Sequence, residues 1–89
     1  MIFIMLSKLK GNATKEDTAR DTKMGEEMLK KGMKVLGNYW TLGRFDDVFI
    51  FEAPTEKDAM KFAIEVAKLG FSSTETLVAI PREEGLKLL

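Results

Sequence analysis

Two short segments of this chain are apolar at every position, and this feature restricts its possible folds most. The segments Ile2–Leu6 and Val48–Phe51 are rich in β-branched and aromatic residues. They lack the polar alternation of a strand that has one face in water. We therefore predict two strands that are buried on both faces, the first broken by Gly11-Asn12 and the second, Asp47–Ala53, stopped by Pro54.

A helix is predicted after each of these strands. The first runs from Thr14 to about Lys31, with Gly32 suited to its end. Its apolar stripe is weak, so it is expected to pack loosely and through small residues (Thr18, Thr22, Gly25 and Leu29, with Met28 and Met33 alongside). The second begins after Thr55 and ends at Gly70, and it has a clear apolar face. That face consists of Ala59, Phe62, Ala63, Val66 and Ala67.

Two further strands, Val35–Leu42 and Ser73–Ile80, complete the order β-α-β-β-α-β. Right-handed crossovers then give a ferredoxin-like antiparallel sheet, an α+β fold in which the first and third strands are central. Both central strands are the apolar ones, which agrees with this arrangement. We expect one domain over residues 1–89, and its tail after Pro81 has room for one more helical turn.

The predicted layers leave one face of the sheet without cover. Two helices can cover one face, yet the central strands are apolar on both. Burying a large apolar side chain is worth roughly 1.5–3 kcal/mol, which a domain of this size could hardly lose. A second copy of the chain is the simplest cover, so we predict a homodimer or higher homo-oligomer.

The composition excludes several classes of function. Fourteen basic residues balance fourteen acidic ones without a basic cluster, which argues against nucleic-acid binding. The absence of histidine and cysteine removes the usual general base, nucleophiles and thiolate or imidazole metal ligands, so no metal site and no cofactor is expected. The apolar start is too short for a signal peptide and no membrane-spanning run follows, so a cytoplasmic protein with no membrane partner is expected.

The densest chemistry lies between Asn38 and Asp46. Tyr39, Trp40, Arg44 and Asp46 are the candidate ligand-binding residues, because they offer aromatic walls, a cation for an anionic group and a carboxylate or phenol for proton transfer. The alternative is structural: strand aromatics would pack in the core, and Asp46 would satisfy turn amides. Catalytic residues are not identifiable from the sequence.

The segment Gly43-Arg44-Phe45-Asp46 resembles the Gly-Tyr-Asp signature of the GYD-domain family, with Phe45 in the tyrosine's place. The resemblance continues through 52–54, the helix that closes at Gly70, 74–77 and the terminal 83–84. It implies a dimeric α/β-barrel, a group whose relatives include cofactor-free monooxygenases, lactone isomerases and amino-acid-sensing domains of AsnC-like regulators. The phenylalanine argues against a role that needs the signature phenol.

Three functions remain open at this point. The first is a small-molecule-binding module with a pocket near Trp40 and Arg44. The second is a cofactor-independent enzyme, monooxygenase- or isomerase-like, that uses Tyr39 or Asp46 for proton transfer on a small aromatic or carbonyl substrate. The third is an assembly protein without a ligand. The missing histidine and cysteine favour binding over catalysis.

The composition also predicts heat resistance. The chain has no Cys, His or Gln and only two Asn, while eleven Lys and nine Glu dominate its charges. This pattern is typical of proteins from heat-adapted organisms. We expect a midpoint of thermal unfolding above the ~45–65 °C of mesophilic domains. Calorimetry checks this, and a midpoint inside that range would argue against a thermophilic origin.

Overall fold

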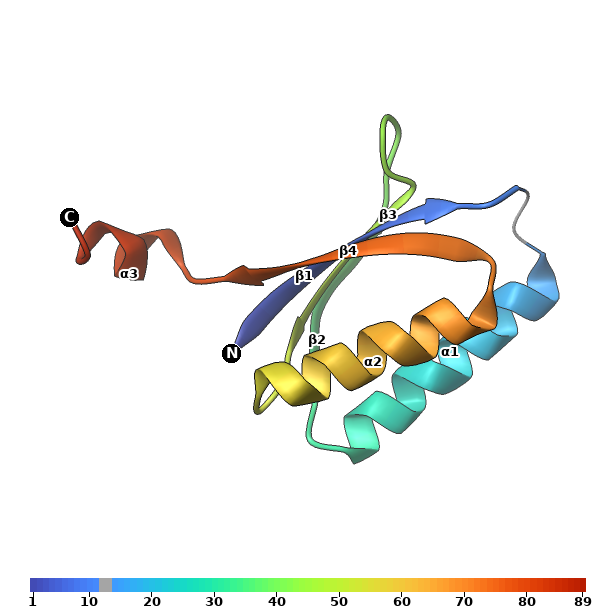
Figure 1. Cartoon of the computed structure of the whole chain (residues 1–89), viewed down its shortest axis with the longest axis horizontal. Coiled ribbons are helices and arrows are strands. Elements are labelled where there is room, and N and C mark those ends of the chain that lie inside the picture. The colour runs from blue at the N-terminus through green and yellow to red at the C-terminus, as the bar shows by residue number, and fades with distance from the viewer. Residues whose placement is uncertain (12–13) are drawn as a thin grey trace.

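The computed structural model describes residues 1–11 and 14–89 and has the predicted ferredoxin-like order. The predicted break after the first strand falls partly outside these residues, since Asn12 is not described. Both long helices lie on one side of a four-stranded sheet (Figure 1). The elements are β1 (Ile2–Leu9), α1 (Lys15–Lys30), β2 (Lys34–Trp40), β3 (Asp47–Glu52), α2 (Glu56–Leu69), β4 (Ser72–Ala79) and α3 (Arg82–Leu86).

The sheet order β2-β3-β1-β4 confirms that the two apolar strands are central. Every neighbouring pair is antiparallel, and the register aligns Ile4 with Ile50 on one side and Leu77 on the other. Directly paired residues share a face of the sheet and successive residues alternate between faces. The register therefore shows which side chains meet the helices.

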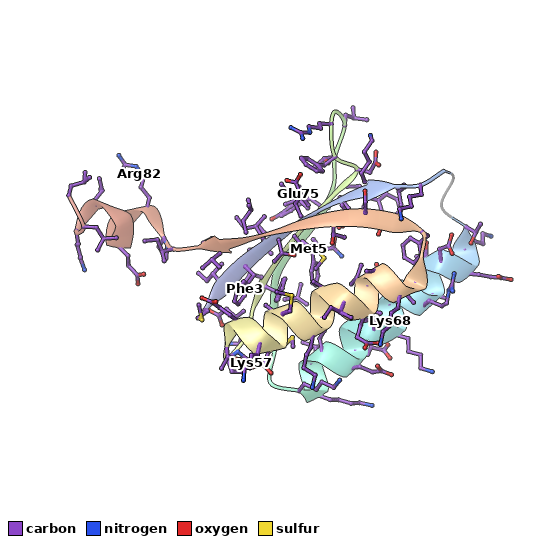
Figure 2. All side chains as sticks on the ribbon, viewed as in Figure 1. Phe3, Met5, Lys57, Lys68, Glu75 and Arg82 are labelled. Atoms are coloured by element: carbon purple, nitrogen blue, oxygen red, sulfur yellow. The ribbon has the colours of Figure 1, made fainter. Side chains whose placement is uncertain are left out.

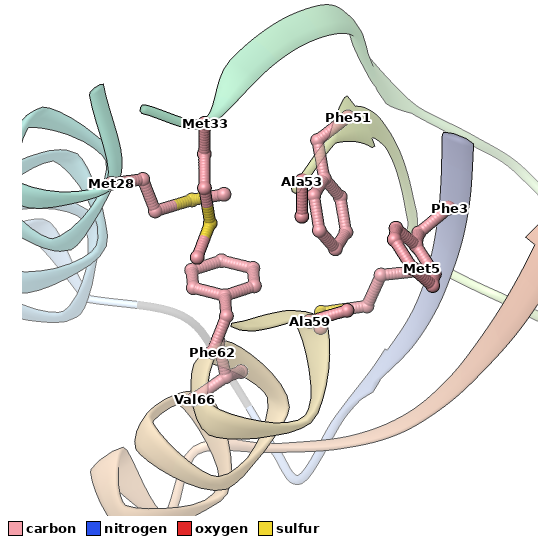
Figure 3. Close-up of a cluster of buried hydrophobic side chains, with 9 residues drawn as sticks. All are labelled: Phe3, Met5, Met28, Met33, Phe51, Ala53, Ala59, Phe62 and Val66. Atoms are coloured by element: carbon pink, nitrogen blue, oxygen red, sulfur yellow. The ribbon is translucent and has the colours of Figure 1, made fainter. Parts of the chain in front are cut away.

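The helix side of the sheet carries the core. Phe3 and Phe51 are fully buried, and their rings stack with centroids 5.5 Å apart. Phe62 of α2 meets the Phe51 ring edge-on at 5.3 Å (Figure 3). The other buried apolar side chains are Met5, Met28, Met33, Ala53, Ala59 and Val66. Aromatic packing under α2 therefore holds the layers together.

The opposite side of the sheet, called the outer face below, is covered by no described element. Its apolar and aromatic residues are Ile2, Ile4, Leu6, Tyr39, Val48, Ile50, Leu77 and Ala79, and the charged residues Lys8, Lys34, Glu52 and Glu75 lie on the same face. Ile4 and Ile50 are half-buried by their neighbours, whereas Leu77 is 47% and Tyr39 58% exposed. Within one chain, the prediction that the central strands are buried on both faces thus holds on the helix side alone.

Capping boxes begin both long helices, with Thr14 and Asp17 in α1 and Thr55 and Asp58 in α2. Gly70 ends α2 in the left-handed conformation, at φ +78°. The packing of the two helices differs. Three residues of α2 are buried, but only Met28 of α1 is, so α1 lies loosely on the sheet as its weak stripe predicts.

Beyond β4 the chain leaves the body of the domain. Residues 80–89 form a C-terminal arm that includes α3 and projects past the end of the sheet, with Arg82 far from α1 and α2 (Figures 1 and 2). Leu88 and Leu89 of this arm are 79% and 101% exposed. In the described part of the chain, every helix is too short or too polar to cross a lipid bilayer.

Candidate functional site

A cavity of about 590 Å³ lies between α1 and the helix side of the sheet. Its volume is within the usual range of small-molecule sites. Small side chains of α1, namely Thr18, Thr22 and Gly25, face it. A Cβ atom added to Gly25 would meet nothing within 4 Å, so this part of α1 does not fill the space above the sheet. The weak apolar stripe of the helix is therefore the reason that the cavity exists.

Aromatic and aliphatic side chains form most of the cavity wall. Phe49 and Phe62 close it toward the core, while Phe71 lies on the connection that follows α2. Trp40 also contributes to the lining, yet it is 85% exposed. Since a largely exposed side chain that still lines a cavity lies at its opening, Trp40 is at the mouth. The remaining lining is polar, and four aspartates carry its charge: Asp17, Asp21, Asp46 and Asp47.

Asp46 joins the β2–β3 connection to the end of β1. Its carboxylate Oδ2 accepts a hydrogen bond from the Leu9 backbone N–H at 2.8 Å. Its own N–H donates to the Ser7 carbonyl at 2.8 Å, and its carbonyl accepts from the Thr41 N–H at 2.9 Å. Asp46 is thus a positioning residue, because these three bonds fix where β3 begins.

Asp47, the next residue, has a different environment. It pairs with Ser7 on the helix side of the sheet, and its side chain lines the cavity. Burial raises the pKa of Asp47 to about 6, and the nearby charge of Asp21 adds to the increase. Burial also raises the pKa of Asp21. Asp47 can therefore gain or lose a proton near pH 6, which suits acid–base chemistry.

The other aspartate on α1 is held as an anion. Asp17 accepts from the Thr14 N–H at 3.0 Å and from the Arg20 guanidinium at 2.7 Å. These hydrogen bonds hold the pKa of Asp17 below its ordinary value. Arg20 lies 6.0 Å from the centre of the Phe71 ring, so this ion pair is at the edge of the cavity.

The candidate residues from the sequence separate in the structure. Trp40 and Asp46 line the cavity, whereas Tyr39 lies on the outer face. Arg44 is in the connection between β2 and β3, 5.3 Å above the Phe45 ring and outside the cavity lining. The proposed cation for an anionic ligand is thus not part of this cavity.

An irregularity in β2 decides which aromatic residue faces the cavity. Val35 and Trp40 both face the helices, although they are an odd number of residues apart. The register shifts between Val35 and Gly37, and this bulge reverses the alternation. Strict alternation from Val35 would have put Tyr39 on the helix side instead. A Cβ atom at Gly37 would lie 2.8 Å from the Tyr39 ring, so the glycine gives this ring its place on the outer face.

Sequence reasoning missed the Asp21–Asp47 pair. Asp47 shares its strand face with Phe49 and Phe51, and Asp21 lies one turn from Thr18 and Gly25, so the spacing could have placed both on inward faces. Adjacent carboxylates such as Asp46-Asp47 are usually solvated or capping groups, and this general tendency argued against a site at Asp47. Among residues 1–11 and 14–89, no three acidic side chains gather in an arrangement that could hold a metal ion.

The comparison with protein families decides the assignment. The profile of the GYD domain matches residues 3–89, nearly the whole chain. The chain belongs to the GYD domain family. In this GYD domain the signature aspartate is Asp46, so the signature residue anchors the β2–β3 connection rather than leaving its carboxylate free.

Solved structures with this fold extend the comparison. One is the 5-chloro-2-hydroxyhydroquinone dehydrochlorinase TftG from Burkholderia phenoliruptrix AC1100, in complex with 2,5-dihydroxybenzoquinone. It matches with a TM-score of 0.65 at 15% identity, over 90% of this chain and 94% of that chain. The crystal structure of FFRP-DM1 matches with a TM-score of 0.56 at 27% identity, over 90% and 100%. At these sequence identities, the comparison shows that the GYD domain has the same fold as both structures. No curated protein sequence matches it significantly.

Proposed function

We propose that this GYD domain is a small-molecule-binding module that works as a homodimer. The observation that carries the proposal is the cavity of about 590 Å³, whose wall combines aromatic rings with a few polar groups. Such a composition is typical of small-molecule sites, where apolar walls supply affinity and sparse polar groups fix orientation. The aromatic wall favours a ring-sized ligand.

The similarity to the dehydrochlorinase supports the same choice of ligand size. That protein was solved with 2,5-dihydroxybenzoquinone, a six-membered ring. The volume of the cavity in this chain suits a ligand of that size. The reaction of the dehydrochlorinase is not extended to this chain, because the two chains are only 15% identical in sequence.

The outer face supports the homodimer. It presents Ile4, Leu6, Val48 and Ile50 beside the more exposed Leu77. A two-fold dimer joins the same surface of two copies, so an apolar sheet face can be buried against itself. The cavities of both copies then remain on the outside of the paired sheets, under α1.

A second candidate is a cofactor-independent enzyme, favoured by one observation. A group with a pKa near the working pH is the most effective general acid or base, and the pKa of Asp47 is about 6. Asp47 is the better choice for this role than Tyr39, on the outer face, or Asp46, engaged with Leu9. Turnover of a ring substrate that Asp47→Asn abolishes without abolishing binding would establish the enzyme.

A ligand screen tests the proposed function. Because Trp40 is at the mouth and is the single tryptophan, its emission and the melting temperature should both change with a bound ring compound. Gly25→Leu should abolish the response by filling the cavity, without loss of stability, since leucine is the better helix former. Arg44→Ala is the matched control and should respond as the unmodified protein does. A diverse screen with no response in either measurement would refute the proposal.

A further inference from the structure

Every charged side chain that lines the cavity is an aspartate. Asp17 and Asp21 come from α1, while Asp46 ends the β2–β3 connection and Asp47 begins β3. Lysine and arginine are absent from the lining of the described cavity. The chain as a whole has equal numbers of acidic and basic residues, so this imbalance belongs to the cavity and not to the composition.

Two of the four carboxylates are already neutralised or engaged. Asp17 is paired with Arg20, and Asp46 accepts the Leu9 N–H. Asp21 and Asp47 have no ion pair or hydrogen-bond partner among residues 1–11 and 14–89. The charge of Asp21 acts on Asp47, which is half-buried, whereas Asp21 is more exposed on the cavity wall. The cavity therefore holds two close carboxylates without a counter-ion.

We propose that the cavity selects a ligand that carries a protonated amine on an apolar ring and rejects a ligand with a carboxylate. This inference rests on the proposed binding function and adds the charge of the ligand. An ammonium group placed between Asp21 and Asp47 would relieve their repulsion and donate charge-assisted hydrogen bonds to both. Phe49, Phe62 and Phe71 would meanwhile enclose the ring. A carboxylate ligand would add a third negative charge to the same half-buried space.

The titration of the pair supports the proposal. Burial raises the pKa of both Asp21 and Asp47, and the charge of Asp21 raises that of Asp47 further, so ionising both carboxyls is unfavourable. The other charged groups near them are Asp17 with Arg20 on α1 and Asp46 on the β2–β3 connection. An ammonium ligand would offset the repulsion between the two ionised carboxylates. Because it binds the ionised form of Asp21 and Asp47, its affinity should increase as the pH rises from 5 to 7.5.

Three probes of similar size and different charge test the inference by calorimetry at low salt and pH 7.5. They are 2-phenylethylamine, 2-phenylethanol and 3-phenylpropanoate. We expect the amine to bind at least about tenfold more tightly than the alcohol, which corresponds to about 1.4 kcal/mol. The propanoate should bind more weakly than both. The double variant D21N/D47N should give the amine and the alcohol equal affinity.

E83Q/E84Q provides the charge-matched control, because it also removes two carboxylates and both residues lie on α3, outside the cavity lining. It should keep the order of the three probes, which would show that net charge is not the cause. Equal affinity for amine and alcohol, tighter binding of the propanoate, or an order unchanged in D21N/D47N would overturn the charge inference alone. A lack of response to every ring compound, including those of the wider screen, would overturn the proposed function itself.

Discussion

Replacing Ile50 with lysine is expected to give a folded monomer, whereas replacing Phe51 with lysine is expected to give a chain that does not fold. The two residues are neighbours on β3 and receive the same side chain. Ile50 lies on the outer face, where lysine would face either water or the partner. Phe51 is fully buried among Phe3, Phe49 and Phe62. Circular dichroism and light scattering would separate the two outcomes.

The magnitudes support this separation. Truncating a buried phenylalanine costs about 3–5 kcal/mol, and burying an unpaired ammonium costs more. Small domains have about 5–15 kcal/mol in total, and this chain is near the lower end of the size range. Lysine at Ile50 would remove apolar contact area and bring a like charge from each copy into the proposed interface. A well-folded monomer of the unmodified protein at micromolar concentration would contradict the dimer.

The adjacent aspartates should respond to alanine with opposite signs. Asp46→Ala removes the acceptor of the Leu9 N–H, and a hydrogen bond to a charged group contributes about 1.5–3 kcal/mol. For a domain of this size, that loss lowers the melting temperature by roughly 10 °C. Asp47→Ala instead removes a carboxylate that burial and Asp21 make unfavourable, so the melting temperature at pH 7.5 should rise by a few degrees.

The gain in Asp47→Ala should depend on pH. The ordinary pKa of an aspartate is 3.8, and in the folded protein that of Asp47 is about 6. A raised folded pKa contributes stability that is fully present below 3.8 and is lost as the pH rises through 6. The variant should therefore exceed the unmodified protein at pH 7.5 and lose this advantage by about pH 4. A difference in melting temperature that stays constant from pH 4 to 8 would show that Asp47 is not perturbed.

The sequence was sufficient for the fold because its signals were redundant. Unbroken apolar runs identified the two central strands, and Thr14, Thr55 and Gly70 marked helix ends through local hydrogen bonding and backbone geometry. Neither signal depends on long-range packing. The face that each strand turns toward the helices did depend on it, because Ile50 and Phe51 are both large and apolar and only the packed layers distinguish them.

The site was less accessible from the sequence for two physical reasons. The bulge before Gly37 reverses the alternation of β2, so no count of residues along the strand could place Trp40 inside and Tyr39 outside. The different environments of Asp46 and Asp47 come from the ends of β1 and α1, which are distant in the sequence. Sequence reasoning located the right segment, but it could not assign roles within it.

The loose contact of α1 with the sheet has a consequence for how such a protein can diverge. Thr18, Thr22 and Gly25 border the cavity, yet they contribute little to folding, since Met28 is the one buried residue of their helix. Substitutions there can change the size and polarity of the site at small cost in stability. A mutation that creates a new specificity is retained only if the protein remains stable enough to fold. In this domain the two requirements fall on different residues, so relatives can acquire new ligands through α1 while the packing around Phe51 stays intact.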